Sequence, residues 1–137
     1  MAERSAQLTH IWLLVENMPA ALAFYHETLG FPIASNLGQY VELDASQNFL
    51  LALFERRAMQ EGEPGIPVRP PKAEGQHGVL AFEIESLDQF CDGLVAKGVQ
   101  FAGGLANHPE WGLRTAFLYD PDGNLLCLYG PIPDQAP

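Results

Sequence analysis

Apolar side chains alternate with other side chains along several short segments of the chain. The first of these segments, residues 10–15, combines two alternating sets: Ile11, Leu13 and Val15, and His10, Trp12 and Leu14. A period of two is typical of a β-strand, and here both faces of the strand are largely apolar. Further short strands are expected at residues 32–35, 40–44 and 49–54.

A helical pattern follows the first of these strands. Asn17 can accept a hydrogen bond from the backbone at the start of a helix, and Gly30 can end one in a left-handed conformation. The apolar residues between them fall on one stripe: Met18, Leu22, Tyr25 and Leu29. Such a stripe predicts a helix that packs against the sheet.

The second half of the chain repeats this order. Leu80, Phe82 and Ile84 alternate as in a strand, and Ser86 with Gln89 forms a capping-box pattern at the start of a helix. The helical stripe and the glycine that ends it are Leu87, Phe90, Leu94, Val95 and Gly98. Three more strands are expected at residues 99–102, 113–119 and 125–129.

The two halves can be aligned with each other from the sequence alone. VEN at 15–17 matches IES at 84–86, and LLALF at 50–54 matches LLCLY at 125–129. Under this alignment the paired positions include His10 with Val79, and Ala52 with Cys127. An internal repeat of this length predicts two copies of one structural unit.

The repeat predicts an α+β fold of two tandem βαβββ modules within a single domain, residues 1–137. The first module spans residues 8–55 and the second spans residues 77–130, with a tail at residues 131–137. The intervening residues 56–76 hold four prolines and four of the seven basic residues. This composition predicts an extended linker.

The predicted strands have two faces that differ in composition. One face is uniformly apolar and suits packing under the two helices: Ile11, Leu13, Val15, Val41, Leu43, Leu51, Leu53, Leu80, Phe82, Ile84, Ala116, Leu118, Leu126 and Leu128. The other set is mixed: His10, Trp12, Tyr40, Glu42, Asp44, Leu50, Ala52, Phe54, His77, Val79, Glu83, Thr115, Phe117, Cys127 and Tyr129. Aromatic walls with a few polar groups are typical of a small-molecule cavity. The alternatives are a second core or a dimer interface.

The charge and the cysteine content narrow the classes of partner. A net charge of −10 disfavours a nucleic-acid partner and favours a cationic ligand, although acidity can also serve solubility alone. Two cysteines and a polar start without a signal-like segment predict a reduced, cytoplasmic protein. No apolar run approaches the length needed to span a bilayer, so no membrane partner is expected.

Several enzyme motifs do not occur in the sequence. It contains no phosphate-binding glycine loop, no HExxH, no CxxC and no G-x-S-x-G. A nucleotide enzyme and a serine hydrolase are therefore disfavoured.

Three separated segments resemble one known family. HIWLLVENMPAALAFYHETLGF at 10–31, LAFEIESLDQFCDGLVAKGV at 80–99 and FLYDPDGNLLCLYG at 117–130 are similar to signatures of the vicinal oxygen chelate superfamily. This superfamily includes glyoxalases, bleomycin resistance proteins and extradiol dioxygenases. The resemblance implies that the two βαβββ modules form a curved, cup-shaped mixed sheet with helices on its outer face, usually in a homodimer.

The resemblance also implies where a metal would bind. In metal-dependent members, four positions that line the cup supply His or Glu side chains to one divalent ion. In this sequence they fall on His10, Ala52, Val79 and Cys127. Only His10 matches the family pattern, and Ala52 and Val79 have no donor atom, so the standard metal site is not expected and no cofactor is predicted.

Two other possibilities for these residues remain open. A shifted metal site would use His10, His77 and either Glu42 or Glu83. Cys127 is a soft metal ligand, a nucleophile or a small hydrophobic residue lining the cavity, and the last is favoured because no basic neighbour is expected to promote its thiolate. Trp111, in a loop, is a candidate to fold over a ligand or to anchor the loop.

The sequence therefore favours a metal-free binding protein, similar to the bleomycin resistance type, over an enzyme. It would take an aromatic or cationic small molecule, for example an antibiotic, in its cavity. The candidate binding residues are His10, Trp12, Tyr40, Glu42, Ala52, Phe54, His77, Val79, Phe117, Cys127 and Tyr129. The alternatives are a lyase, isomerase or dioxygenase with a displaced divalent-metal site, and a protein that acts only through a protein partner.

Overall fold

The computed structural model describes residues 9–61, 79–109 and 112–133. The chain forms two compact units, Met1–Pro71 and Lys72–Pro137. The boundary between them falls inside the segment predicted as a linker. The single-domain assignment stays a prediction, and each unit is described separately below.

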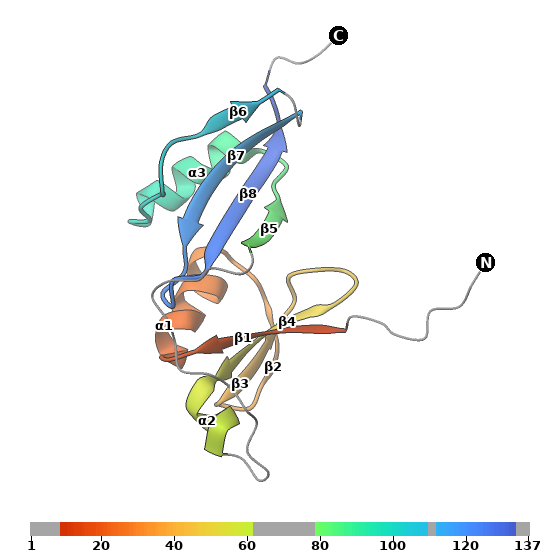
Figure 1. The fold of residues 1–137 in the computed structure, drawn as a ribbon, viewed down its shortest axis with the longest axis vertical. Coiled ribbons are helices and arrows are strands. Elements are labelled where there is room, and N and C mark those ends of the chain that lie inside the picture. Colours follow the sequence, from red (N-terminus) through yellow and green to blue (C-terminus); the bar gives the residue numbers. More distant parts are fainter. Residues whose placement is uncertain (1–8, 62–78, 110–111, 134–137) are drawn as a thin grey trace, which may run out of the picture. The chain divides into compact units, whose positions relative to one another are not determined.

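The first unit contains one four-stranded sheet and its helices (Figure 1). In chain order its elements are β1 (His10–Val15), α1 (Met18–Leu22), η1 (Ala23–Thr28), β2 (Ile33–Asn36), β3 (Tyr40–Leu43), β4 (Leu50–Glu55) and α2 (Arg56–Glu61). The strands lie in the order β1-β4-β3-β2. Strands β1 and β4 are parallel, and the other two pairs are antiparallel.

The second unit has the same topology. Its elements are β5 (Val79–Glu83), α3 (Leu87–Ala96), β6 (Ala106–His108), β7 (Leu113–Tyr119) and β8 (Leu125–Pro131). The strand order β5-β8-β7-β6 again pairs the first strand with the last in parallel. The predicted α+β fold of two βαβββ modules is therefore confirmed.

The strand register confirms the internal alignment residue by residue. His10 lies opposite Leu50 in the first unit, and their counterparts Val79 and Leu125 lie opposite each other in the second. Because side chains alternate along a strand, this shared register puts equivalent positions on equivalent faces.

The apolar strand face and the helix beside it form the core of each unit. Buried strand residues include Val15, Val41, Leu43, Leu51 and Leu53 in the first unit and Ala116, Leu118, Leu126 and Leu128 in the second. The helices contribute Met18, Ala21, Tyr25 and Leu29, and Leu87, Cys91 and Leu94. The prediction that this face packs under the helices is confirmed.

The first helix begins as predicted but changes its winding. The Asn17 side chain accepts a hydrogen bond from the Ala20 backbone N–H at 3.0 Å, and Gly30 ends the helix with φ of 87°. From Ala23 the turns widen into a π-helix, in which the Leu29 N–H donates to the Phe24 carbonyl. Ala21 is fully buried in place of the predicted Leu22, while Met18, Tyr25 and Leu29 are buried as predicted.

Two predictions about the second helix are wrong. The Ser86 side chain makes no capping hydrogen bond, because its backbone at φ −125° and ψ 80° does not form the expected cap. Val95 is 59% exposed rather than buried, since the buried stripe runs through Leu87, Cys91 and Leu94.

The strand predicted at residues 99–102 is also wrong. Only one strand-like bond remains there, from the Ala102 N–H to the Phe117 carbonyl at 2.8 Å. Gly103 then turns the chain with φ of 91°, and pairing with β7 begins later, in β6. The left-handed conformation of Gly103 interrupts the extended backbone between residues 99–102 and β6.

The predicted linker starts with a helix. Residues 56–61 form α2, and Met59 in it is only 4% exposed. The extended conformation predicted for these six residues is wrong, because Arg, Ala, Met, Gln and Glu all favour helix and the first proline comes at residue 64. The rest of the linker lies outside the described residues. At the other end, β8 extends to Pro131 and Ile132 is buried, so the second unit continues past residue 130.

A matched pair of substitutions tests the first core. We expect Leu53→Ala to lower the free energy of unfolding by about 2–5 kcal/mol, because Leu53 is fully buried and its removal leaves a cavity. Leu37→Ala, the same change at a position that is 74% exposed, should cost less than about 0.5 kcal/mol. Urea unfolding followed by circular dichroism measures both, and equal losses would contradict the assigned core.

Candidate functional site

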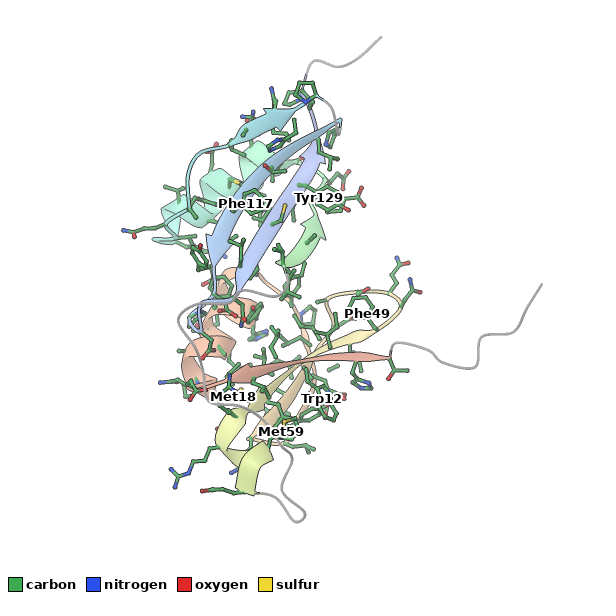
Figure 2. All side chains as sticks on the ribbon, viewed as in Figure 1. Trp12, Met18, Phe49, Met59, Phe117 and Tyr129 are labelled. Carbon is green, nitrogen blue, oxygen red and sulfur yellow. The ribbon has the colours of Figure 1, made fainter. Side chains whose placement is uncertain are left out.

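The face of each sheet away from its buried core carries the mixed set of side chains. We call His10, Trp12, Tyr40, Glu42, Ala52 and Phe54 the first mixed face. The second mixed face consists of Val79, Ala81, Glu83, Thr115, Phe117, Cys127 and Tyr129. Figure 2 shows Trp12 in the first unit, and Phe117 and Tyr129 on the strands of the second.

Three aromatic rings on the first mixed face contact one another edge to face. The Phe54 ring centroid lies 5.5 Å from that of Trp12 and 5.1 Å from that of Tyr40. Trp12 and Tyr40 are 6.4 Å apart, with their planes at 85°. Trp12 is nevertheless 50% exposed, so this cluster presents a large aromatic surface to its surroundings.

The register explains why these groups meet. Ala52 lies between Trp12 on β1 and Glu42 on β3, and Phe54 lies opposite Tyr40. The alanine is fully buried although it lies on the mixed face, because its larger neighbours on both sides cover its methyl group.

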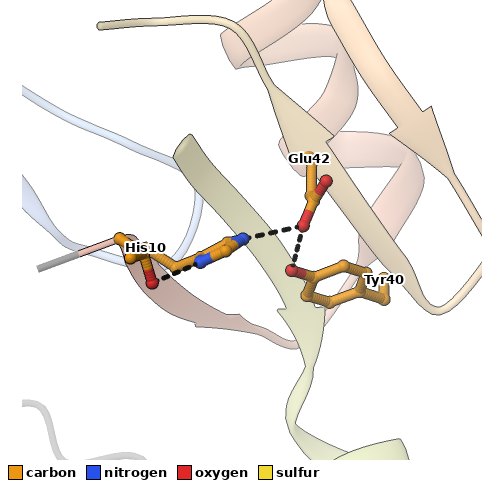
Figure 3. Close-up of polar contacts among 4 residues, drawn as sticks. His10, Tyr40 and Glu42 are labelled. Carbon is orange, nitrogen blue, oxygen red and sulfur yellow. Dashed lines mark hydrogen bonds and ion pairs between the residues drawn. The ribbon is translucent and has the colours of Figure 1, made fainter. Parts of the chain in front are cut away.

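A chain of hydrogen bonds converges on Glu42 (Figure 3). The Tyr40 hydroxyl donates to Glu42 Oε2 at 2.6 Å, and His10 Nε2 lies 3.0 Å from the same oxygen. His10 Nδ1 lies 2.9 Å from the Thr9 hydroxyl. One polar network therefore joins His10, Tyr40 and Glu42. The sequence had predicted only that these residues lie on the same face.

The chemistry of Glu42 fixes the proton positions in this network. A carboxylate only accepts hydrogen bonds, so the His10 nitrogen that faces it carries the proton. In the neutral ring Nδ1 then accepts from the Thr9 hydroxyl. Thr9 was not among the site residues predicted from the sequence. Its position next to His10 was the only sign of this contact in the sequence.

The network holds Tyr40 in its protonated form. Burial, the hydrogen bond to Glu42 and the negative charge of Glu42 together raise the pKa of Tyr40 to about 12, although a hydrogen bond from Trp12 lowers it. Tyr40 therefore remains a hydrogen-bond donor across the physiological pH range.

The second mixed face has different chemistry. Cys127 lies between Ala81 and Phe117 in register, and burial raises the pKa of its thiol. This environment disfavours the thiolate and so argues against a nucleophilic role for Cys127. A contact that the sequence did not reveal joins His108 Nε2 to the buried Thr115 hydroxyl at 2.9 Å.

The donor set does not fit the metal ion that the family resemblance implies. His10 Nε2 is hydrogen-bonded to Glu42, Ala52 and Val79 offer no donor atom, and the pKa of Cys127 is raised. Within the described ranges no three His, Cys, Asp or Glu side chains gather as a metal site would require. His77 of the shifted alternative, and Trp111, lie outside the described residues.

The structure brings six of the predicted site residues together on the first sheet: His10, Trp12, Tyr40, Glu42, Ala52 and Phe54. Val79, Phe117, Cys127 and Tyr129 lie on the second sheet. None of the helices in the described part of the chain is both long and apolar enough to cross a membrane.

Comparisons with known proteins agree with this fold. Residues 7–128 match the family model of the Glyoxalase/Bleomycin resistance protein/Dioxygenase superfamily. An uncharacterized protein of Bacillus subtilis (strain 168), YraH, is 32% identical over 126 residues, which cover 90% of this chain and 97% of that protein.

Solved structures also share the fold. A glyoxalase/bleomycin resistance protein/dioxygenase from Nocardioides has a TM-score of 0.79 at 21% identity, with 100% of this chain and 90% of that chain covered. A lactoylglutathione lyase from Agrobacterium tumefaciens has a TM-score of 0.71 at 22% identity, with 94% and 96% covered. At these identities the likeness concerns the fold alone.

The network predicts how Tyr40 titrates. Glu42→Gln should lower the pKa of Tyr40 from about 12 toward its ordinary value of 10.0, because the variant removes the charge and weakens the hydrogen bond. Ultraviolet absorbance of tyrosinate against pH measures this shift, and Tyr40→Phe identifies which transition belongs to Tyr40. In the control Glu27→Gln the pKa of Tyr40 should stay unchanged. If the pKa of Tyr40 is also unchanged in Glu42→Gln, the proposed network is contradicted.

The same shift affects stability. The unfolded chain releases this proton near pH 10.0 and the folded chain near pH 12, so the contribution of Tyr40 is complete below pH 10.0 and is lost as the pH rises toward 12. The stability of the Tyr40→Phe variant should not show this loss between pH 10.0 and 12, because phenylalanine has no proton to release.

Proposed function

Because the chain belongs to the Glyoxalase/Bleomycin resistance protein/Dioxygenase superfamily, we propose that it binds a small aromatic or cationic organic molecule on its first mixed face without a metal ion. The observation that carries the proposal is that Glu42 lies across Ala52 from the half-exposed Trp12, on the same face as two further aromatic rings. An aromatic face attracts planar groups and cations, and a neighbouring carboxylate strengthens the attraction for cations.

The charge of the protein supports a cationic ligand. A net charge of −10 raises the concentration of cations near the surface. Under this proposal the protein is a cytoplasmic homodimer that sequesters its ligand, for example a cationic antibiotic, rather than converting it. Both cysteines, Cys91 and Cys127, are free thiols, which supports a reducing compartment.

A metal-dependent enzyme is the second candidate, and one observation favours it. His10 Nε2 and Glu42 Oε2 are 3.0 Å apart, which is close enough for both to reach one ion if their hydrogen bond were replaced. A lyase, isomerase or dioxygenase of this type would need at least one more donor. The first proposal is preferred because it leaves the hydrogen bonds of His10 and Tyr40 to Glu42 unchanged.

A binding titration tests the first proposal. In a Trp111→Phe background Trp12 is the only tryptophan, and a bleomycin-like glycopeptide should change its fluorescence in a saturable way. Calorimetry should show that Trp12→Ala weakens binding about tenfold or more, because a central aromatic contact is worth about 2 kcal/mol.

Val95→Ala is the control for this experiment, since Val95 is exposed on α3. It should leave the affinity unchanged. If no cationic or aromatic antibiotic gives a saturable signal, the proposed function is wrong.

Metal analysis separates the two candidates. Protein purified without a histidine tag should carry much less than one divalent ion per chain, because the residues that the structure describes offer no third ligand beside His10 and Glu42. Inductively coupled plasma mass spectrometry measures the content. About one ion per chain that is lost in His10→Ala but retained in His26→Ala would instead establish the enzyme candidate.

A further inference from the structure

Resting on the proposed function, we infer that the ligand is a protonated amine joined to a flat apolar group, and that its N–H binds Glu42 Oε1. The inference starts from the unequal use of the two carboxylate oxygens. Oε2 receives both the Tyr40 hydroxyl and the His10 ring nitrogen. Oε1 has no partner among the residues that the structure describes.

Glu42 Oε1 is also open to a ligand. The Glu42 side chain retains 19% of its exposure, and no buried side-chain oxygen or nitrogen in the described ranges lacks a partner. Since Oε1 has no partner there, it must reach the surface. It therefore offers two free lone pairs at the edge of the aromatic cluster.

The charge of Glu42 is not balanced by a permanent cation in the described part of the chain. Arg56 pairs with Glu16, Arg57 with Glu61 and Arg114 with Asp88. Among the residues that the structure describes, the one basic group at Glu42 is His10, which is charged only when protonated. A partly buried carboxylate without a permanent positive charge beside it gains from a cationic partner.

The neighbouring rings define the rest of the ligand. Trp12 is half exposed and lies across Ala52 from Glu42, so a molecule bonded to Oε1 has an aromatic surface within reach. A flat or short apolar group next to the ammonium would cover that surface. Free lone pairs on Oε1 also favour a cation that carries N–H groups over a quaternary ammonium, which cannot donate.

Three phenethyl compounds of matched shape test these two requirements on the full chain with Glu42 intact. Phenethylamine is a cation with N–H donors, trimethyl(phenethyl)ammonium is a cation without them, and 2-phenylethanol is neutral. Each is titrated into the millimolar range against the fluorescence of Trp12 in the Trp111→Phe background, at an excitation wavelength that the phenyl ring does not absorb.

We expect the amine to bind about tenfold tighter than either of the other compounds, since only the amine can form a charge-assisted hydrogen bond to Oε1. Glu42→Gln should abolish this preference and leave the affinity for the alcohol nearly unchanged. Glu27→Gln, the same charge change in η1, should keep the preference and so excludes an effect of net charge alone.

The outcomes separate this inference from the proposed function. Equal affinity for all three compounds, or a preference that survives Glu42→Gln, would overturn the inference and leave binding on this face intact. A quaternary ammonium that binds as tightly as the amine would overturn the role of Oε1 as acceptor. If none of the three changes the Trp12 signal, the inference fails, and a parallel failure of the glycopeptide titration would remove the proposed function as well.

Discussion

Each unit pairs its first strand with its last in parallel, and the register of that pair positions the rest of the unit. In the first unit it aligns His10 with Leu50, and in the second it aligns Val79 with Leu125. A slip of one residue would move the buried leucines of β4 or β8 to the opposite face and expose them. The apolar side chains under the helices therefore hold the register, and the register in turn positions the mixed face.

The same backbone arrangement carries different chemistry in the two units. At equivalent positions the first unit has Trp12, Ala52 and Glu42 in one row, whereas the second has Ala81, Cys127 and Phe117. The first row combines an exposed ring with a carboxylate, and the second is apolar apart from a protonated thiol. The repeat thus explains the fold, but the function depends on residues that differ between its copies.

Much of the fold could be predicted from the sequence because it depends on local periodicity and on the internal repeat. Alternation located β1, β7 and β8, and the alignment of LLALF with LLCLY identified the positions that are equivalent in the two units. Backbone geometry was less accessible: the π-helical turns after Ala23 and the late start of β6 depend on φ and ψ values that periodicity does not determine.

The sequence predicted which residues share the candidate site but not which hydrogen bonds join them. His10, Tyr40 and Glu42 could be assigned to one face from alternation alone, since each alternates along its own strand with the apolar residues of the other face. Their hydrogen bonds cross from β1 and along β3, and they depend on side-chain rotamers that a pattern of residues does not specify. Thr9 had no periodic role at all, so only the structure could show its contact with His10.

The convergence of His10 and Tyr40 on one oxygen has two consequences for function. The His10 nitrogen that faces Glu42 uses its proton in that bond, so its lone pair is not available to a metal ion. The other carboxylate oxygen, Oε1, remains the acceptor that a ligand can use. A metal site and an amine site would compete for the same two residues, because metal ligation requires the hydrogen bond to break and amine binding requires it to remain.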